Sequence, residues 1–122
     1  MVSTRKKGDS AELKIKSKFE ELGFNVIRSP RTFRQIFINS SRKYISKDND
    51  FFNLFDLICK SKESTLWIQV KSTPSDASKV KPAITEFASL YGSPSDKFLI
   101  YVVERKRIYY YELDGDVWRR HN

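Results

Sequence analysis

The sequence predicts an α/β protein with a mixed central β-sheet flanked by helices. Three observations predict it: an amphipathic helical pattern opens the chain, alternating or wholly apolar strand patterns follow, and a second helical pattern precedes the last strands. The 122 residues suit one domain over 1–122, because domains commonly run about 100 to 150 residues. No internal repeat or low-complexity tract interrupts this order.

The first helix is expected from about Ser10 to Leu22. Asp9 or Ser10 can cap its first turn, and Gly23 supplies a left-handed stop from which Phe24 folds back on the last turn. Its buried stripe is predicted to hold four apolar residues at helical spacing: Ala11, Ile15, Phe19 and Leu22.

Strand patterns follow. A short strand is expected over 24–28, closed by Ser29 and Pro30. Region 31–53 is harder to interpret: 35–38 reads as a strand and 40–50 as a polar loop. Runs 52–59 and 66–71 look like central strands, joined by a tight hairpin between residues 60 and 65.

In the second half of the chain, a helical pattern is again followed by strand patterns. A helix is expected to start near Pro82 and end at Gly92, with Ile84, Phe87, Ala88 and Tyr91 facing inward. Runs 97–103 and 107–113 predict two strands, and the turn Asp114-Gly115 predicts that 117–118 pairs back as a short last strand.

Charge and composition narrow the function class. The chain carries 23 Lys and Arg against 15 acids, a net charge of +8, which favours a polyanionic partner such as nucleic acid. We find no apolar run of 18 residues and no apolar stretch after the basic start, so we expect no membrane span, no secretory signal and a cytoplasmic protein. Its single cysteine, Cys59, lies in an apolar run and is expected to be a small buried hydrophobe.

Asp56 is the residue that an inert core explains least well. A carboxylate between Phe55 and Leu57 in a strand costs several kcal/mol unless it is paired or bound to metal. Gln69 and Lys71 project to one side of the next strand, because residues two apart do so, and all three can converge at one end of the sheet. These residues alone leave two interpretations open: a buried Asp56–Lys71 ion pair beside Gln69, or a functional site.

Three motifs in this order resemble the PD-(D/E)XK nuclease pattern: Lys7-Gly8 with Glu12, then Phe55-Asp56-Leu57-Ile58, then Ile68-Gln69-Val70-Lys71. More narrowly, residues 7–13 and 21–30 resemble the opening of archaeal Holliday-junction resolvases, where a glycine-glutamate helix leads into a strand ending in Arg-x-Pro. The similarity covers roughly residues 5–30 and 53–73.

The resemblance implies a restriction-endonuclease-like core and a Mg²⁺-dependent endonuclease, with Mn²⁺ as a substitute, that resolves branched four-way DNA as a homodimer. It implies catalytic roles for Glu12, Asp56, Gln69 and Lys71. It places metal ligands at Glu12, Asp56, Gln69 and the backbone carbonyl of Val70. It places DNA contacts at Arg5, Lys6, Arg28, Ser29 and Arg31.

Two features depart from the family pattern. Gln69 stands where a second strand acid is expected, so Mg²⁺ affinity should be weaker, and Glu86 on the second helix is either a compensating acid or a solvated one. Region 31–53 is longer than expected, and an insertion there would alter substrate choice or dimer contacts. The alternatives are therefore a catalytically weak or inactive DNA-binding module, or a repair- or restriction-type nuclease acting on linear DNA.

Aromatic residues near the end of the sequence are a weaker indication of nucleic-acid binding. The run Tyr109-Tyr110-Tyr111 is either a stacking platform for single strands or, more typically, half core and half surface. His121 near the chain end is not expected to act as ligand or base.

Overall fold

Two helices and eight strands follow one another in the computed structural model, which describes residues 4–29, 31–38, 41–48, 51–52 and 54–122. Side chains are described for 10–29, 51–52 and 54–122. In chain order the elements are α1 (Thr4–Glu21), β1 (Asn25–Arg28), β2 (Arg31–Ile38), β3 (Ser41–Asp48), β4 (Leu57–Lys60), β5 (Thr65–Lys71), α2 (Pro74–Tyr91), β6 (Asp96–Val103), β7 (Ile108–Asp114) and β8 (Val117–His121).

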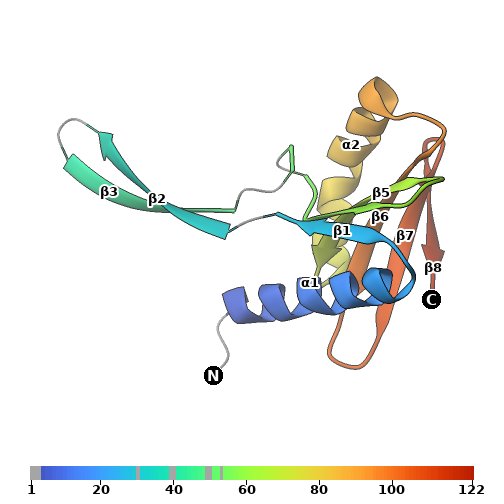
Figure 1. Ribbon diagram of the computed structural model, residues 1–122, viewed down its shortest axis with the longest axis horizontal. Helices are drawn as coiled ribbons and strands as arrows, with labels where there is room; N and C mark the ends of the chain where they lie inside the picture. The colour runs from blue at the N-terminus through green and yellow to red at the C-terminus, as the bar shows by residue number, and fades with distance from the viewer. Residues whose placement is uncertain (1–3, 30, 39–40, 49–50, 53) are drawn as a thin grey trace.

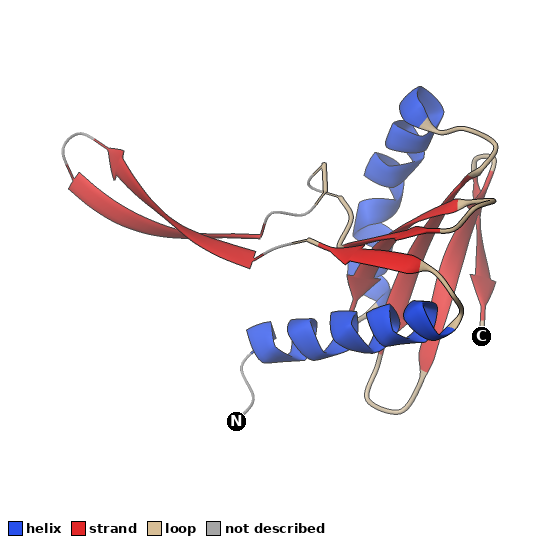
Figure 2. Ribbon diagram, viewed as in Figure 1, coloured by secondary structure: helices blue, strands red, loops and turns tan. Residues whose placement is uncertain are grey.

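Among the described residues, six strands form one mixed sheet in the order β1-β4-β5-β6-β7-β8. Strands β5 and β6 are parallel, and the other neighbours are antiparallel. Helix α2 makes the crossover between β5 and β6 that a parallel pair requires. The predicted mixed α/β arrangement is therefore confirmed, and Figure 1 and Figure 2 show the two helices packed against the sheet.

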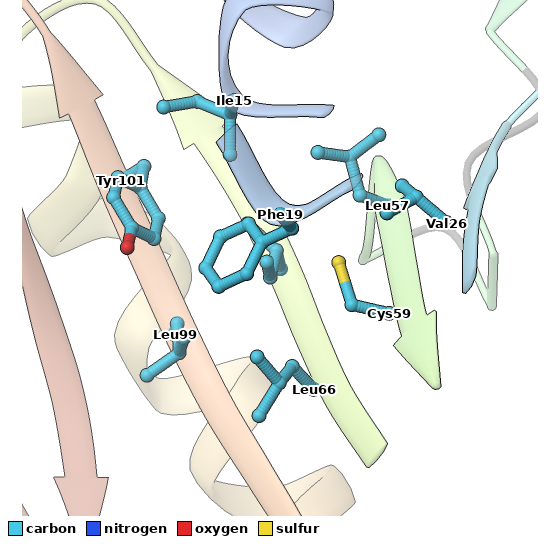
Figure 3. Close-up of a cluster of buried hydrophobic side chains, with 9 residues drawn as sticks. Ile15, Phe19, Val26, Leu57, Cys59, Leu66, Leu99 and Tyr101 are labelled. Carbon is cyan, nitrogen blue, oxygen red and sulfur yellow. The ribbon is translucent and has the colours of Figure 1, made fainter. Parts of the chain in front are cut away.

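Helix α1 covers one face of the sheet. Ile15 and Phe19 pack on Leu57, Ile68 and Tyr101 in one buried cluster (Figure 3), and the Phe19 and Tyr101 rings meet edge to face at 5.8 Å. Gly23 takes the predicted left-handed conformation with φ of +93°, and the Phe24 ring returns to within 5.6 Å of the Phe19 ring.

Two expectations for this helix were wrong. It begins at Thr4 instead of Ser10. The sequence does not mark this start, because residues 4–9 hold no large apolar side chain and so show no apolar periodicity. Leu22 is 63% exposed, since the helix ends one residue earlier and Phe24 takes the place beside Phe19.

Helix α2 covers the opposite face, where Ala77 and Ile84 join a second buried cluster with Phe55, Phe98 and Ile100. It begins eight residues before the predicted start at Pro82, which lies inside the helix. The helix starts at Pro74, after the N-cap residue Thr73. Thr73 Oγ1 accepts a hydrogen bond of 3.1 Å from the Asp76 amide, and Pro74 suits the first turn. Tyr91, expected inside, is 70% exposed at the last residue of the helix.

Consecutive antiparallel strands in the described part of the chain are β2–β3, β4–β5, β6–β7 and β7–β8. The predicted connection of β4 to β5 is confirmed, with the Ser61 amide donating to the Ser64 carbonyl at 2.9 Å. Gly115, with φ of +65°, makes the predicted turn from β7 into β8. Strand β8 extends to His121 and is longer than expected. The expected loop over 40–50 is wrong, because Ser41–Asp48 forms β3 and pairs with β2 over eight positions.

The expected strand over 52–59 is shorter, because β4 starts only at Leu57. The Phe51 amide donates to the Phe55 carbonyl at 2.8 Å, and Phe52 adopts φ of +55°, so the chain turns before the strand begins. None of the helices in the described part of the chain is long and apolar enough to cross a membrane.

Cys59 is free, as predicted, and lies in the buried cluster between α1 and the sheet, here called the α1-side core. This burial controls the ionisation of its thiol. Desolvation raises the pKa of this thiol to about 12, and the nearby Glu20 carboxylate adds to the rise. Folding therefore favours the neutral thiol over the thiolate.

We predict that Cys59 makes stability fall in mild alkali. The unfolded thiol titrates near pH 8.5, so its contribution is complete below that pH and is lost as the pH rises. Between pH 7.5 and 9.5 the free energy of unfolding should fall by about 1 kcal/mol more in the wild type than in a Cys59→Val variant. Urea denaturation at the two pH values measures this, and equal falls in both proteins would contradict it.

Candidate functional site

The ends of three strands meet at one end of the main sheet. Strand β1 ends at Arg28, β4 begins at Leu57 and β5 ends at Lys71, and β4 is antiparallel to both neighbours, so these termini lie side by side. The carboxyl ends of the parallel strands β5 and β6 lie at this same end. Open α/β sheets commonly bind ligands outside the carboxyl ends of their parallel strands.

Buried polar side chains gather here. Among the side chains that the structure describes, the buried polar or charged ones are Glu12, Ser29, Asp56 and Gln69, which are 3%, 4%, 6% and 4% exposed. All four were predicted as site residues from the sequence. Two carboxylates so withdrawn from water need hydrogen-bond or charge partners, because an unsupported buried charge costs several kcal/mol.

Asp56 is held by the strands on both sides of it. Its backbone carbonyl accepts a hydrogen bond of 2.8 Å from the Ser29 amide, and its own amide donates to the Ile68 carbonyl at 2.8 Å. Its side-chain Oδ2 accepts from the Val70 amide, also at 2.8 Å. The Asp56 carboxylate thus accepts a hydrogen bond from a backbone N–H of β5, one residue before β4 begins at Leu57.

Gln69 converges on the same donor. Its Oε1 lies 3.1 Å from the Val70 amide nitrogen that Asp56 also contacts, so the two side-chain oxygens share one N–H group. This confirms the expected approach of Asp56 and Gln69 across the paired strands. Lys71 follows two residues later on the same side of β5 and is half-buried.

Glu12 reaches this end of the sheet from α1. Its Oε1 lies 3.2 Å from the guanidinium Nε of Arg28 at the end of β1, and the Glu12 side chain is 4% exposed. Arg28, predicted from the sequence as a DNA contact, is therefore the ion-pair partner of the buried helix acid. Sequence reasoning missed this pairing, although Arg28 lies two residues after the buried Val26 and so on the side of the sheet that α1 covers.

The donor set suits a hard divalent cation. The side chains of Glu12, Asp56 and Gln69 and the Val70 carbonyl can each present an oxygen atom, the ligand that Mg²⁺ prefers. Within the described residues no three His, Cys, Asp or Glu side chains gather in one place. The residues fit Mg²⁺ in chemistry, with less negative charge than three acids would supply.

The remaining predicted residues are placed in part. Arg5 and Lys6 lie in the first turn of α1, and Arg31 opens β2 three residues after β1 ends, but their side chains lie outside the described residues. Glu86 is exposed on α2, as the solvated interpretation has it.

The late aromatic residues do not form an open stacking platform. Tyr109 is 2% exposed, and Tyr110 stacks between Tyr101 and His121 at ring distances of 4.9 and 4.8 Å. The Tyr111 ring lies under the Lys81 ammonium at 3.9 Å. These contacts support the half-core interpretation, and they place His121 in the paired strand β8 rather than at a loose chain end.

Comparison with known proteins supports the fold alone. No protein-family model and no curated protein matches this sequence. Solved structures do match, among them a crystal structure of a protein called SSO0001, with a TM-score of 0.52 and 18% sequence identity over 95% of this chain. This chain spans 54% of the length of that one.

We predict that the Arg28–Glu12 pair stabilises the site end of the sheet. An Arg28→Ala variant leaves a buried carboxylate without its guanidinium, so the free energy of unfolding should fall by about 1–3 kcal/mol, and adding Glu12→Gln should recover part of the loss. The control is Arg119→Ala, because the Arg119–Asp114 pair is about two-thirds exposed on both sides and should contribute less than about 1 kcal/mol. Chemical denaturation of the four proteins checks this, and an equal loss in the two arginine variants would contradict it.

Proposed function

We propose that this protein is a Mg²⁺-dependent endonuclease with a restriction-endonuclease-like core that cuts branched, four-way DNA. The observation that carries the proposal is the burial of Glu12, Asp56 and Gln69 at the end of the sheet where β1, β4 and β5 meet. These residues stand in the order of the PD-(D/E)XK pattern. A chain with net charge +8 adds the general attraction to DNA phosphates that such an enzyme needs.

The chain prepares the site before any substrate binds. The Val70 amide holds one oxygen of Asp56, so the carboxylate does not have to be ordered when a cation arrives. The Arg28 guanidinium holds Glu12 in the same way. Glu12, Asp56, Gln69 and the Val70 carbonyl would hold the cation, which supplies a water of lowered pKa and neutralises charge on the scissile phosphate.

In this proposal the Lys71 ammonium faces the scissile phosphate. It is half-buried at the end of β5, two residues from Gln69 and on the same side of the strand. Its ammonium can orient the attacking water or stabilise negative charge that develops on the phosphate. Cutting a four-way junction symmetrically requires two active sites, so the proposal includes a two-fold homodimer.

The decisive variant is Asp56→Asn, which keeps an oxygen that can accept from the Val70 amide and removes the charge. Nicking of a labelled four-way junction in Mg²⁺ or Mn²⁺ should fall by about 100-fold or more, because a metal ligand loses its charge. The matched control is Glu86→Gln, an exposed acid on α2 that should cut as the wild type does. Thermal unfolding verifies the fold of each variant.

Equal cleavage by the Asp56→Asn variant would overturn the proposal. The same assay on flapped, linear duplex and single-stranded DNA separates a junction resolvase from a repair- or restriction-type nuclease.

A second candidate function is a nuclease-like module that binds branched DNA without cutting it. Three observations favour it. Position 69 is an amide, and the described residues bring no third acid to the site. Glu12 is also already neutralised by Arg28, which lowers its attraction for a cation.

A Gln69→Glu variant separates the two candidates. In a working but weak site the added charge should raise cleavage about 10-fold at low Mg²⁺ and bring the activity of the two proteins together at high Mg²⁺. Titration of the nicking rate with Mg²⁺ measures this. If neither form cuts at any concentration while junction binding persists in a gel-shift assay, the binding module is the correct function.

A further inference from the structure

The β2–β3 ribbon is the part of the fold that the proposed active site leaves unexplained. Its strands pair with each other from Arg31–Asp48 to Ile38–Ser41, and within the described residues neither pairs with a strand of the main sheet. Figure 1 shows the ribbon extending away from the body of the molecule. It starts three residues after β1 ends, so it is rooted at the end of the sheet that holds Ser29 and Asp56.

The sequence of the ribbon indicates the chemistry of its partner. Residues 31–48 contain five Lys or Arg and one Asp, so this segment supplies about half of the chain's net charge of +8. All five cations lie at paired register positions, and three of them stand opposite apolar residues: Arg34 opposite Ile45, Lys43 opposite Ile36 and Arg42 opposite Phe37. A second copy of this chain carries the same positive charge, which opposes pairing of two ribbons, whereas a polyanion is attracted.

The shape and length of the ribbon fit duplex DNA. An isolated two-stranded ribbon is only marginally stable in water, so a partner that covers it adds to its stability. The major groove of B-DNA is about 12 Å wide and admits a two-stranded β-ribbon. Eight residues at about 3.4 Å each span about 27 Å, which matches about eight base pairs.

We propose that the β2–β3 ribbon is a DNA-binding arm that lies in the major groove of the duplex next to the cleavage site. The arm adds phosphate contacts over about eight base pairs on one side of the site. This inference rests on the proposed function for the position of the scissile phosphate, while the binding of the arm to duplex DNA does not depend on cleavage.

The test compares two triple variants with equal loss of charge. The arm variant combines Arg34→Ala, Arg42→Ala and Lys43→Ala. The control combines Lys60→Ala, Lys62→Ala and Lys97→Ala, three exposed lysines at the opposite end of the sheet, where β4 ends and β6 begins. Both are made in the Asp56→Asn chain and studied in EDTA, so that DNA binding is measured without cutting.

The readouts are hydroxyl-radical footprints and the salt dependence of the affinity for a four-way junction with long arms. The arm variant should lose about eight base pairs of protection. The negative slope of log affinity against log salt should become shallower by about 2 to 3, because each lost phosphate contact removes about 0.9 from its magnitude. The control should keep the full footprint and change the slope by less than about 1.

Two results would overturn the inference. If both variants weaken binding equally and the footprint keeps its length, the ribbon contributes only general charge. If the arm variant changes the sedimentation mass of the free protein and leaves the footprint intact, the ribbon binds a second copy of the chain. A wild-type chain that shows the extended footprint but never cuts DNA would instead remove the nuclease proposal and leave the arm in place.

Discussion

The burial of charge at one end of the sheet is the constraint on which the rest of the structure depends. Glu12 and Asp56 are both nearly inaccessible to water, and each would destabilise the fold if it lacked a partner. Arg28 at the end of β1 supports Glu12, and the Val70 amide in β5 supports Asp56. These two contacts fix the first helix, the β1 edge and the centre of the sheet relative to one another. A shift of α1 along the sheet would separate Glu12 from its guanidinium, so the helix position follows from electrostatics as well as from the packing of Ile15 and Phe19.

The order of the strands explains why the polar residues share one end. The β4–β5 hairpin turns at Ser61–Ser64, so the start of β4 and the end of β5 lie opposite that turn. Helix α2 then returns the chain so that β6 runs parallel to β5 and ends beside it. The α1-side and α2-side cores fill both faces of the sheet with apolar side chains. The buried polar side chains therefore lie at the strand ends, where the ladder of backbone hydrogen bonds is incomplete and leaves donors for them.

Sequence reasoning succeeded where one physical signal dominated. The strands near 66–71 and 97–103, the left-handed Gly23 and the Asp114-Gly115 turn follow from periodicity or from backbone conformations that glycine favours. It failed where signals competed. Pro82 predicts a helix start, although Thr73 and Pro74 provide the cap, and the polar β3 lacks the alternation of a strand that packs on a core. At the site, register predicted that Asp56 and Gln69 converge. The Glu12–Arg28 pair joins residues 16 apart across two elements, so it depends on a helix position that no local pattern specifies.

The shared Val70 amide gives a physical reason for an amide at position 69. Asp56 Oδ2 and Gln69 Oε1 both bind this one N–H, so their oxygens lie close together. A glutamate there would place a second negative charge beside Asp56, and like charges so near raise the free energy of the fold unless a cation separates them. The neutral amide removes that repulsion and so stabilises the close approach of the two strand ends. An amide at position 69 also attracts a cation less than a carboxylate would, so in the proposed site the stability of this end of the sheet and its affinity for Mg²⁺ change in opposite directions with one side chain.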